Sequence, residues 1–233
     1  METTGSSAEK SARLKRPSQA AALVAADARA AVAARGRFVI AVSGGHTPWL
    51  MLGALTAQDV PWHSVYVLQV DERVAPAGHK DRNFTPQSEI LQGVLRPEQL
   101  LGMPVESPDL EAAAIQYAAS LRKIAGSPAV LDLVHLGLGP DGHTASLVPG
   151  DRALDVNDAD VAVTGIYQGR RRLTLTYPVL NRSRRILWLV TGDEKLGMLA
   201  RLRSGDVSIP AGRVRRDRAV VFVDQTAARR LAA

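Results

Sequence analysis

The stretch VLDLVHLGLGPDGHTASLVP, residues 130–149, joins a mainly apolar run to a turn that is rich in glycine. The apolar part, residues 130–137, predicts a buried strand. Three glycines and Pro140 then break the regular backbone, and the polar side chains of Asp141 and His143 lie among them. A chain gives up local stability in such a segment, so it is either a plain loop or the place where the chemistry occurs.

Strands and helices alternate along the rest of the chain. Further strands are predicted at 37–43, 65–70 (ending in 71–73), 100–103, 160–164, 172–176, 186–190 and 219–223. Helices are predicted at 17–35, 49–57, 88–95, 109–125 and 193–203, with Asp109 as one N-cap and Asp224 as the cap of a last helix. The alternation predicts an α/β fold with a mainly parallel sheet covered on both faces. Leucine and threonine alternate within 172–176, so one face of that strand is expected to be exposed.

The composition is that of an ordinary globular protein, with 233 residues, 46% of them hydrophobic and 22% charged. We predict a single domain over residues 17–233 and a disordered basic tail over residues 1–16. Cysteine is absent, which excludes disulfides and thiolate metal sites. This absence agrees with a reducing cytoplasm as the expected location.

The formal net charge of +6 is compatible with nucleic acid or with small anionic substrates as partners. The basic residues are scattered and aromatic residues do not alternate with them, so no nucleic-acid partner is predicted. No apolar segment reaches the roughly 18 residues of a membrane span. The N-terminus also lacks the apolar part of a secretory signal, and we therefore expect no membrane partner.

Four of the predicted strands end in polar residues. These strand ends are 43–48, 71–73, 137–143 and 191–195. In open α/β sheets ligands bind beyond the carboxyl ends of the strands, where such ends converge. The sequence therefore predicts a binding site along this edge of the sheet.

The segment 43–48 reads Ser-Gly-Gly-His-Thr-Pro and leads into a predicted helix. Backbone N–H groups at such a point attract an anion, and Ser43 and Thr47 add hydroxyl donors. The segment has neither the Walker A nor the GxGxxG pattern, and a tight turn that needs glycine is the alternative interpretation. Lys195 is predicted in the first turn of another helix, where it either reaches a phosphate or lies in solvent.

Two groups of residues are candidates for the reaction itself. Asp71, Glu72 and Arg73 form either a structural ion cluster or a carboxylate and a guanidinium of the site. His143 is the candidate general base, because the ordinary pKa of histidine, about 6.5, lies near neutrality. Asp141 either orients its imidazole or closes a local turn.

The remaining candidates are weaker. Ser146 offers a Ser-His-Asp triad only on paper, because no GxSxG motif is present. His135 is assigned to the core and His63 to a turn, whereas the roles of His46 and His79 stay open. No histidines are spaced for a metal ion, so we predict neither a metal nor a cofactor.

Three motifs carry a family resemblance: Ser-Gly-Gly-x-Thr-Pro at 43–48, Asp-Glu-Arg at 71–73 and Leu-Gly-x-Gly-x-Asp-Gly-His-Thr-Ala-Ser at 136–146. The same order continues with Asn83 and Phe84, Arg-Leu-Thr-Leu-Thr at 172–176, and Gly192-x-x-Lys195. From about residue 18 to 224 the chain resembles the 6-phosphogluconolactonase family. The resemblance implies a Rossmann-like three-layer α/β/α sandwich.

The resemblance also implies an activity, the hydrolysis of 6-phospho-D-glucono-1,5-lactone to 6-phospho-D-gluconate in the oxidative pentose phosphate pathway. The expected partner is this small-molecule sugar-phosphate lactone, bound by a monomer or weak homo-oligomer. His143 would activate the attacking water, Asp141 would orient the imidazole of His143, and Arg73 with loop N–H groups would hold the oxyanion. The residues expected to bind the substrate and its phosphate are Ser43, Gly44, Gly45, Thr47, Asp71, Arg172 and Lys195.

Two alternative functions stay open. Glucosamine-6-phosphate deaminases and isomerases share the fold that the resemblance implies, but they carry a tyrosine at the position of Arg73 and a working glutamate at that of Val148. Valine cannot move a proton, which favours the lactonase. The other alternative is a non-enzymatic sugar-phosphate sensor, which usually needs a further domain. His46, Arg82 and Pro140 also depart from the family's usual residues, without removing a group assigned to catalysis.

Overall fold

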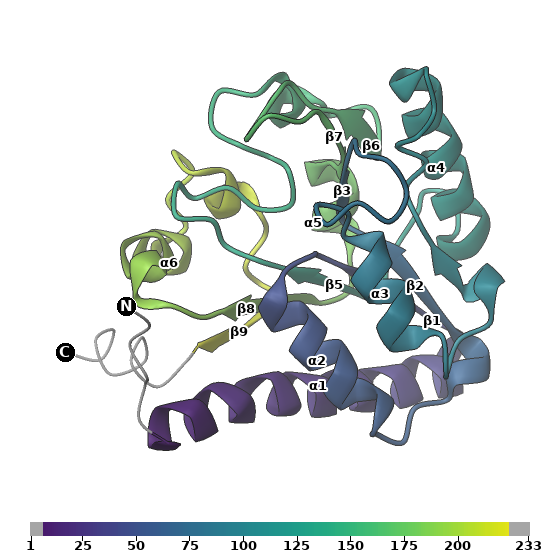
Figure 1. Cartoon of the computed structure of the whole chain (residues 1–233), viewed down its shortest axis with the longest axis vertical. Helices are drawn as coiled ribbons and strands as arrows, with labels where there is room; N and C mark the ends of the chain where they lie inside the picture. Colours follow the sequence, from purple (N-terminus) through teal and green to yellow (C-terminus); the bar gives the residue numbers. More distant parts are fainter. Residues whose placement is uncertain (1–6, 224–233) are drawn as a thin grey trace.

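A six-stranded sheet, parallel throughout, forms the centre of the molecule (Figure 1). The computed structural model describes the backbone of residues 7–223 and, from residue 17 on, their side chains. In sheet order the strands are β4 (Leu100–Leu101), β2 (Val65–Gln69), β1 (Phe38–Val42), β5 (Leu133–Leu136), β8 (Ile186–Val190) and β9 (Ala219–Val223). Each lies within a predicted stretch, so the predicted α/β fold with a mainly parallel sheet is confirmed.

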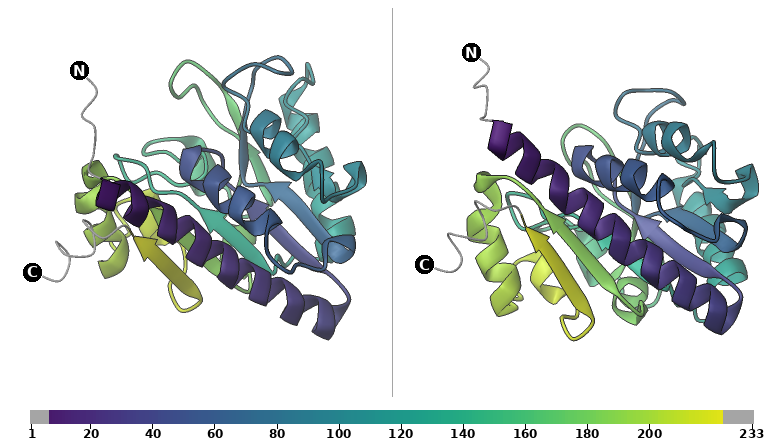
Figure 2. Two further views of the ribbon diagram at one scale, coloured as in Figure 1. Left: turned by 60° about the horizontal axis from the view of Figure 1, so that its bottom comes forward. Right: turned by 90° about the horizontal axis from the view of Figure 1, so that it is seen from below.

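Helices cover both faces of this sheet. One layer consists of α1 (Ser7–Arg35), α2 (His46–Thr56) and α3 (Phe84–Leu91), and the other of α4 (Leu110–Ala125), α5 (Tyr177–Arg182) and α6 (Leu196–Ser204). Seen from below, α1 crosses in front of the strands (Figure 2). Successive β1 residues alternate between the layers: Phe38, Ile40 and Val42 pack toward α1, whereas Val39 and Ala41 pack toward α4. The three-layer sandwich is therefore confirmed.

Several helix ends differ from the prediction. The helix α1 begins at Ser7 and continues through Pro17, although proline removes one helix hydrogen bond and was expected to start the helix. The predicted tail thus overlaps a helix over residues 7–16, and residues 1–6 lie outside the described part. The Asp109 cap is confirmed, because its side chain accepts the N–H of Ala112 at 3.0 Å. The helix predicted after Asp224 lies outside the described residues.

Short 3-10 turns occupy several connections. They are η1 (Trp62–Ser64), η2 (Pro97–Gln99), η3 (Arg152–Asp155), η4 (Asp193–Lys195) and η5 (Pro210–Arg213). The helix predicted at 193–203 is thereby split into η4 and α6. None of the helices within residues 7–223 combines the length and the apolar character that a membrane span needs.

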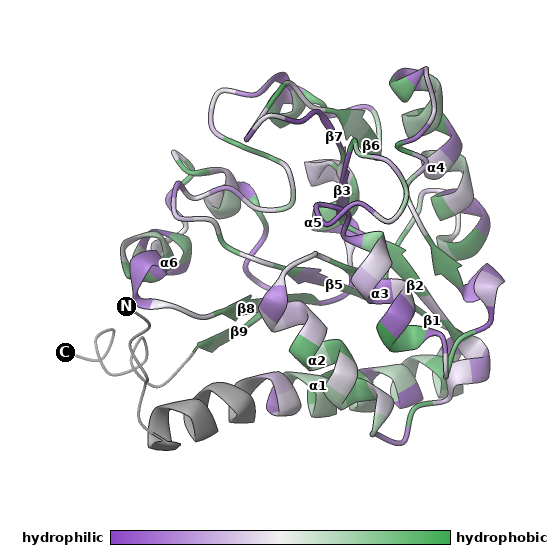
Figure 3. Cartoon of the chain, in the orientation of Figure 1, coloured by the Kyte–Doolittle hydropathy of each residue, from purple (hydrophilic) through white to green (hydrophobic). Residues whose placement is uncertain are grey.

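A second sheet was not predicted. It is antiparallel, with the order β3 (Asp71–Arg73), β7 (Arg172–Leu175) and β6 (Val161–Val163). The expectation that residues 71–73 continue β2 is wrong, because the chain leaves the parallel sheet after Gln69 and Asp71 pairs with Thr174. In Figure 3 the strand β3 is hydrophilic, in contrast to the apolar strands of the main sheet.

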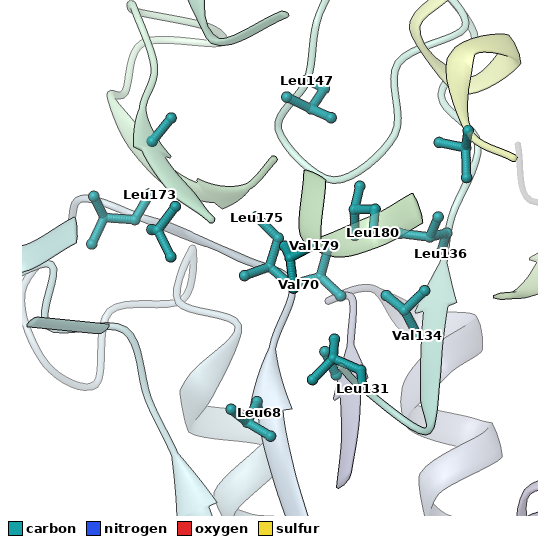
Figure 4. Packing of buried hydrophobic residues seen from close by; sticks show 14 of the residues in the cluster. Leu68, Val70, Leu131, Val134, Leu136, Leu147, Leu173, Leu175, Val179 and Leu180 are labelled. Carbon is teal, nitrogen blue, oxygen red and sulfur yellow. The ribbon is translucent and has the colours of Figure 1, made fainter. Parts of the chain in front are cut away.

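The small sheet packs onto the main core. Leu173 and Leu175 belong to the same buried cluster as Val134 and Val70, and Figure 4 shows Leu175 beside Val70. The N–H of Leu175 also donates to the carbonyl of Val70 at 2.8 Å. All four residues of β7 are buried, so the expected exposed face of this strand is wrong. The threonine face is covered by protein, and it includes the fully buried Thr174.

His135 lies in β5, one of the two central strands of the sheet, and is fully buried, as predicted for a core residue. Neither of its ring nitrogens has a hydrogen-bond partner among the described residues. Burial lowers the pKa of His135 to about 4. The imidazole is therefore neutral at the pH of the cell and resists protonation inside the sheet.

This residue is expected to make the protein acid-sensitive. The unfolded chain binds the proton first as the pH falls, so the free energy of unfolding decreases between pH 6.5 and about 4. The loss from this group amounts to roughly 3 kcal/mol at about 1.4 kcal/mol per pKa unit. In His135→Leu this part of the slope should vanish, without loss of stability near neutral pH. Urea unfolding across this range measures the effect, with the exposed His63→Leu as control, and equal slopes in wild type and His135→Leu would contradict it.

Candidate active site

The carboxyl ends of β2, β1, β5 and β8 open into one cavity of about 260 Å³. Strands added after β1 extend the sheet to one side, and those from β5 on extend it to the other. Such a switch point leaves a crevice in which α/β proteins bind their ligands. The Ser43 hydroxyl bridges the two strands there, donating to the carbonyl of His135 at 3.0 Å.

The cavity brings together the residues predicted from the four strand ends. Those lining it are Ser43, Gly44, Gly45, Thr47, Asp71, Arg73, His143, Arg172 and Lys195. Asp141 does not line the cavity but contacts His143 from behind. His46 also lines the cavity, whereas His79 pairs with Asp81 and Arg170 outside it.

The segment at 43–48 ends β1 and begins α2. The first turn of α2 has no side-chain cap, so its backbone N–H groups remain available to an anion at the cavity. Thr47 Oγ1 lies 2.9 Å from Thr191 Oγ1, which ties this turn to the end of β8. Gly44 is required by close approach, because a Cβ there would lie 1.9 Å from Oδ1 of Asn83.

Glu72 turns out to be structural. Its side chain is fully buried. The groups around it are the N–H groups of Arg73, Asn83 and Phe84 and the amide of Gln69, all donating at 2.8–2.9 Å, and the Arg82 guanidinium at 3.3 Å. These donors fix β3 against the start of α3, and Asn83, which the sequence analysis left out of the site, reaches the cavity as a result.

Asp71 faces the opposite way and lines the cavity. Its Oδ2 accepts the hydroxyl of Ser146 at 2.5 Å, and Nη1 of Arg172 donates to the same Ser146 oxygen at 3.3 Å. Burial raises the pKa of Asp71, while Ser146 and the two arginines, Arg172 and Arg73, oppose the rise. The Ser146 hydroxyl therefore donates to Asp71 and not to His143, so the described part of the chain contains no Ser-His-Asp triad built on Ser146.

His143 and Asp141 form a close pair. Oδ1 of Asp141 lies 2.6 Å from Nδ1 of His143 and also accepts the backbone N–H of that residue at 3.1 Å. Burial raises the pKa of Asp141, but the hydrogen bonds from His143 outweigh it, so its pKa lies below the usual value. The carboxylate can only accept, so Nδ1 carries the proton and Nε2 keeps a lone pair. Asp141 thus combines the two alternative roles, because its carboxylate accepts from both the ring and the backbone N–H of His143.

The imidazole rests on Gly139. A Cβ at this position would lie 2.1 Å from Nδ1 of His143, so only glycine leaves room for the ring. Tyr167, which the sequence analysis missed, closes the other side: its hydroxyl donates to Oδ2 of Asp141 at 3.1 Å. The sole sequence signal was the turn Gln168-Gly169 between two predicted strands.

Among residues 17–223, no group of three or more His, Cys, Asp or Glu side chains is placed to hold a metal ion. The charged groups of the cavity are instead mainly cationic. Arg73, Arg172 and Lys195 line the same space as Asp71. Burial lowers the pKa of Arg172, with its neighbour Asp71 opposing the change. The arrangement suits an anionic ligand next to a histidine base.

Residues 13–223 match the family described as glucosamine-6-phosphate isomerases/6-phosphogluconolactonase. The chain belongs to this family. It is 39% identical over 176 residues to the 6-phosphogluconolactonase of Synechocystis sp., covering 71% of each chain. It is 36% identical over 218 residues to that of Mycobacterium tuberculosis, covering 87% of this chain and 88% of the relative. The family predicted from the motifs is thereby confirmed.

Solved structures agree with this membership. The 6-phosphogluconolactonase of Thermotoga maritima superimposes with a TM-score of 0.79 at 26% identity, covering 89% of this chain and 94% of that one. A monomeric glucosamine-6-phosphate deaminase reaches a TM-score of 0.80 at 17% identity, covering 93% and 96%, which shows a shared fold only. That deaminase therefore shares this architecture, so the fold alone does not separate the two activities and individual residues must do so.

The buried Glu72 carboxylate is expected to be a main source of local stability. In Glu72→Gln an amide NH₂ replaces one acceptor oxygen and faces N–H donors, which should lower the free energy of unfolding by about 3 kcal/mol. The matched control is Glu106→Gln, whose side chain is 56% exposed and also pairs with Arg82, and there the loss should stay below about 0.5 kcal/mol. Urea unfolding compares the two, and similar losses would remove Glu72 from this role.

Proposed function

We propose that this chain hydrolyses 6-phospho-D-glucono-1,5-lactone to 6-phospho-D-gluconate, the second step of the oxidative pentose phosphate pathway. The observation that carries the proposal is the Asp141–His143 pair at a cavity that also holds Arg73, Arg172 and Lys195. A lactone needs a base for water, and its phosphate needs cations. Relatives named 6-phosphogluconolactonase, at 36–39% identity, support the same activity.

His143 is the general base in this proposal. Since Nδ1 is held by Asp141, Nε2 has the free lone pair and takes a proton from the water that attacks C1 of the lactone. The resulting imidazolium is stabilised by the Asp141 carboxylate at 2.6 Å and returns its proton to the ring oxygen as the C1–O bond breaks. A lactone is an activated ester, so a covalent nucleophile is unnecessary, in keeping with the commitment of Ser146 to Asp71.

The oxyanion of the tetrahedral intermediate needs donors that are already in place. Arg73 lines the cavity, its Nη1 donates to the carbonyl of Asp81 at 3.0 Å, and its buried Nε has no partner among the described residues. A guanidinium held at one nitrogen and free at another suits this task. Backbone N–H groups of the glycine-rich turns are further donors in the proposal.

The phosphate is assigned to the other end of the cavity. The first turn of α2, with its uncapped N–H groups and the hydroxyl of Thr47, supplies donors and the positive end of a helix dipole. Lys195, the last residue of η4, which follows β8, adds a full charge. Ser43 contributes through its backbone, since its hydroxyl is used by His135. Holding the phosphate fixes C1 relative to the base.

The deaminase activity is the alternative within the family. Val148 stands at the position where the resemblance places the deaminase's working glutamate. Its side chain is buried, with 4% exposed, and it has no group that could transfer a proton. Purified protein given fresh 6-phosphogluconolactone should form 6-phosphogluconate well above the uncatalysed rate. A parallel assay should find no ammonia from glucosamine 6-phosphate. The opposite pair of results would reverse the assignment, and binding without turnover of either would point to a sensor.

Two expectations complete the proposal. A monomer or weak homo-oligomer is expected, and sedimentation measures it. A cytoplasmic location is expected from the lack of cysteine, and fractionation of cells tests it.

Replacing the base is expected to abolish most of the catalysis. In His143→Ala, kcat should fall by about 10²- to 10⁴-fold, the usual contribution of a general base, with the fold intact by circular dichroism. His63→Ala, an exposed histidine outside the cavity, should leave kcat unchanged. An unaltered kcat in the His143 variant would remove it from the mechanism.

Replacing the phosphate-binding lysine is expected to act on KM. Lys195→Ala should raise KM for the phosphorylated lactone about tenfold or more, equivalent to about 1.4 kcal/mol of binding, with kcat little changed. KM for the unphosphorylated glucono-1,5-lactone should not move. Lys123→Ala, on the exposed surface of α4, is the control. A rise in KM of equal size for both lactones would show that Lys195 does not bind the phosphate.

A further inference from the structure

The hairpin between β6 and β7 places the side chain of Tyr167 against the Asp141–His143 pair. Tyr167 and Arg170 exchange backbone hydrogen bonds of 3.0 and 3.3 Å around the two-residue turn Gln168-Gly169, whose φ angles of 53° and 78° are both left-handed. This is the tight turn that suits twisted antiparallel strands. A residue at such a tip is ordinarily in solvent. The side chain of Tyr167 is instead half-buried against the Asp141–His143 pair.

Three contacts hold the Tyr167 side chain. The hydroxyl donates to Oδ2 of Asp141 at 3.1 Å. The ring meets the imidazole of His143 edge-on, with centroids 5.4 Å apart and planes at 68°. The Arg172 guanidinium lies over its face, 5.0 Å from the centroid, and also donates to Oε1 of Gln168 at 3.2 Å. Tyr167 therefore contacts both the Asp141–His143 pair and the Arg172 guanidinium, which the proposal assigns to the substrate.

We propose that Tyr167 is a positioning residue, which locks the Asp141 carboxylate so that His143 presents Nε2 to the substrate, and which couples this pair to Arg172. The inference rests on the function proposed above. Nothing in the family motifs quoted from the sequence includes this tyrosine.

The proton positions make the locking specific. The hydroxyl of Tyr167 lies 3.5 Å from Nδ1 of His143, but that nitrogen gives its proton to Asp141 at 2.6 Å. The hydroxyl proton is therefore directed to the second carboxylate oxygen. Burial and the hydrogen bond to Asp141 raise the pKa of Tyr167, so the phenol remains a donor at neutral pH. With both oxygens occupied, the carboxylate has one orientation.

Loss of the phenol should change how His143 titrates. The hydroxyl draws negative charge from Asp141, and without it the carboxylate stabilises the imidazolium more strongly. The ionisable groups that face His143 are Asp141 and Tyr167 in contact, Arg172 on the tyrosine ring, and Asp71, Arg73, His46 and Lys195 around the same cavity. Since none of the others changes in a Tyr167 variant, a shift of the His143 titration to higher pH reports the lost hydrogen bond.

Tyr167→Phe tests the proposal, because it removes the hydroxyl and keeps the ring. We expect kcat to fall about three- to tenfold, the range of one hydrogen bond, with KM within about twofold. The acidic limb of the kcat/KM profile should move to higher pH. Tyr177→Phe is the matched control: its hydroxyl donates to the carbonyl of Pro210 at 2.9 Å, so its loss should change neither kcat nor the profile.

A second measurement does not depend on turnover. Nitrogen-15 NMR of labelled histidine in the free protein follows the tautomer and titration of His143 directly. In Tyr167→Phe the midpoint should rise relative to wild type, and in Tyr177→Phe it should not. An inactive wild type with this shift would reject the proposed function but keep the positioning role. A fall in kcat without any shift in the titration would mean that Tyr167 only packs, which overturns the inference.

A larger substitution separates the two contacts of Tyr167. Tyr167→Leu removes the ring as well, so Arg172 loses its stacking partner and KM should now rise together with the loss in kcat. A Tyr167→Leu variant with the same KM as Tyr167→Phe would show that the tyrosine does not couple the Asp141–His143 pair to Arg172.

Discussion

The buried carboxylate of Glu72 is the constraint on which the site depends. A carboxylate without solvent is tolerated only if its oxygens are fully hydrogen-bonded and its charge is compensated. Its donors come from β2, from β3 and from the start of α3, so these segments must meet at one point. Side chains alternate along a strand, and with Glu72 turned into the core its neighbours Asp71 and Arg73 are directed to the cavity. The buried charge of Glu72 thus determines the direction of the side chains of Asp71 and Arg73.

The groups on the other wall of the cavity are also held by several contacts each. His143 lies on a glycine that leaves room for its ring, Asp141 receives both its backbone and its ring N–H, and Tyr167 holds the remaining carboxylate oxygen. Each group is held by at least two partners from different segments. A base that is held in this way loses little entropy when the substrate arrives, which is the physical sense of preorganisation. Arg172 contacts both walls of the cavity: it donates to Ser146, which binds Asp71, and its guanidinium lies over the ring of Tyr167, which binds Asp141.

Much of the fold could be predicted because its signals are local. The six parallel strands are mainly apolar runs, and glycine follows within two residues the ends of β1, β4, β5 and β8. The convergence of the strand ends follows from parallel topology alone. The second sheet escaped prediction because a single residue, Val70, separates β2 from β3, so the pattern reads as one strand. The alternation in β7 predicted solvent on one face, yet Thr174 is fully buried there by the packing of distant segments.

The sequence by itself determined the layers, the edge of the sheet that carries the chemistry, and nearly all of the residues around the cavity, because short-range periodicity and strand-end motifs encode them. Only the tertiary structure decided what each residue does. It made Glu72 a structural carboxylate and Asp71 a cavity residue. It also placed the Ser146 hydroxyl against Asp71 rather than His143, and the Tyr167 hydroxyl against Asp141. Those roles depend on contacts between residues far apart in the chain, and the distances and hydrogen-bond partners that define them exist only once the layers have packed.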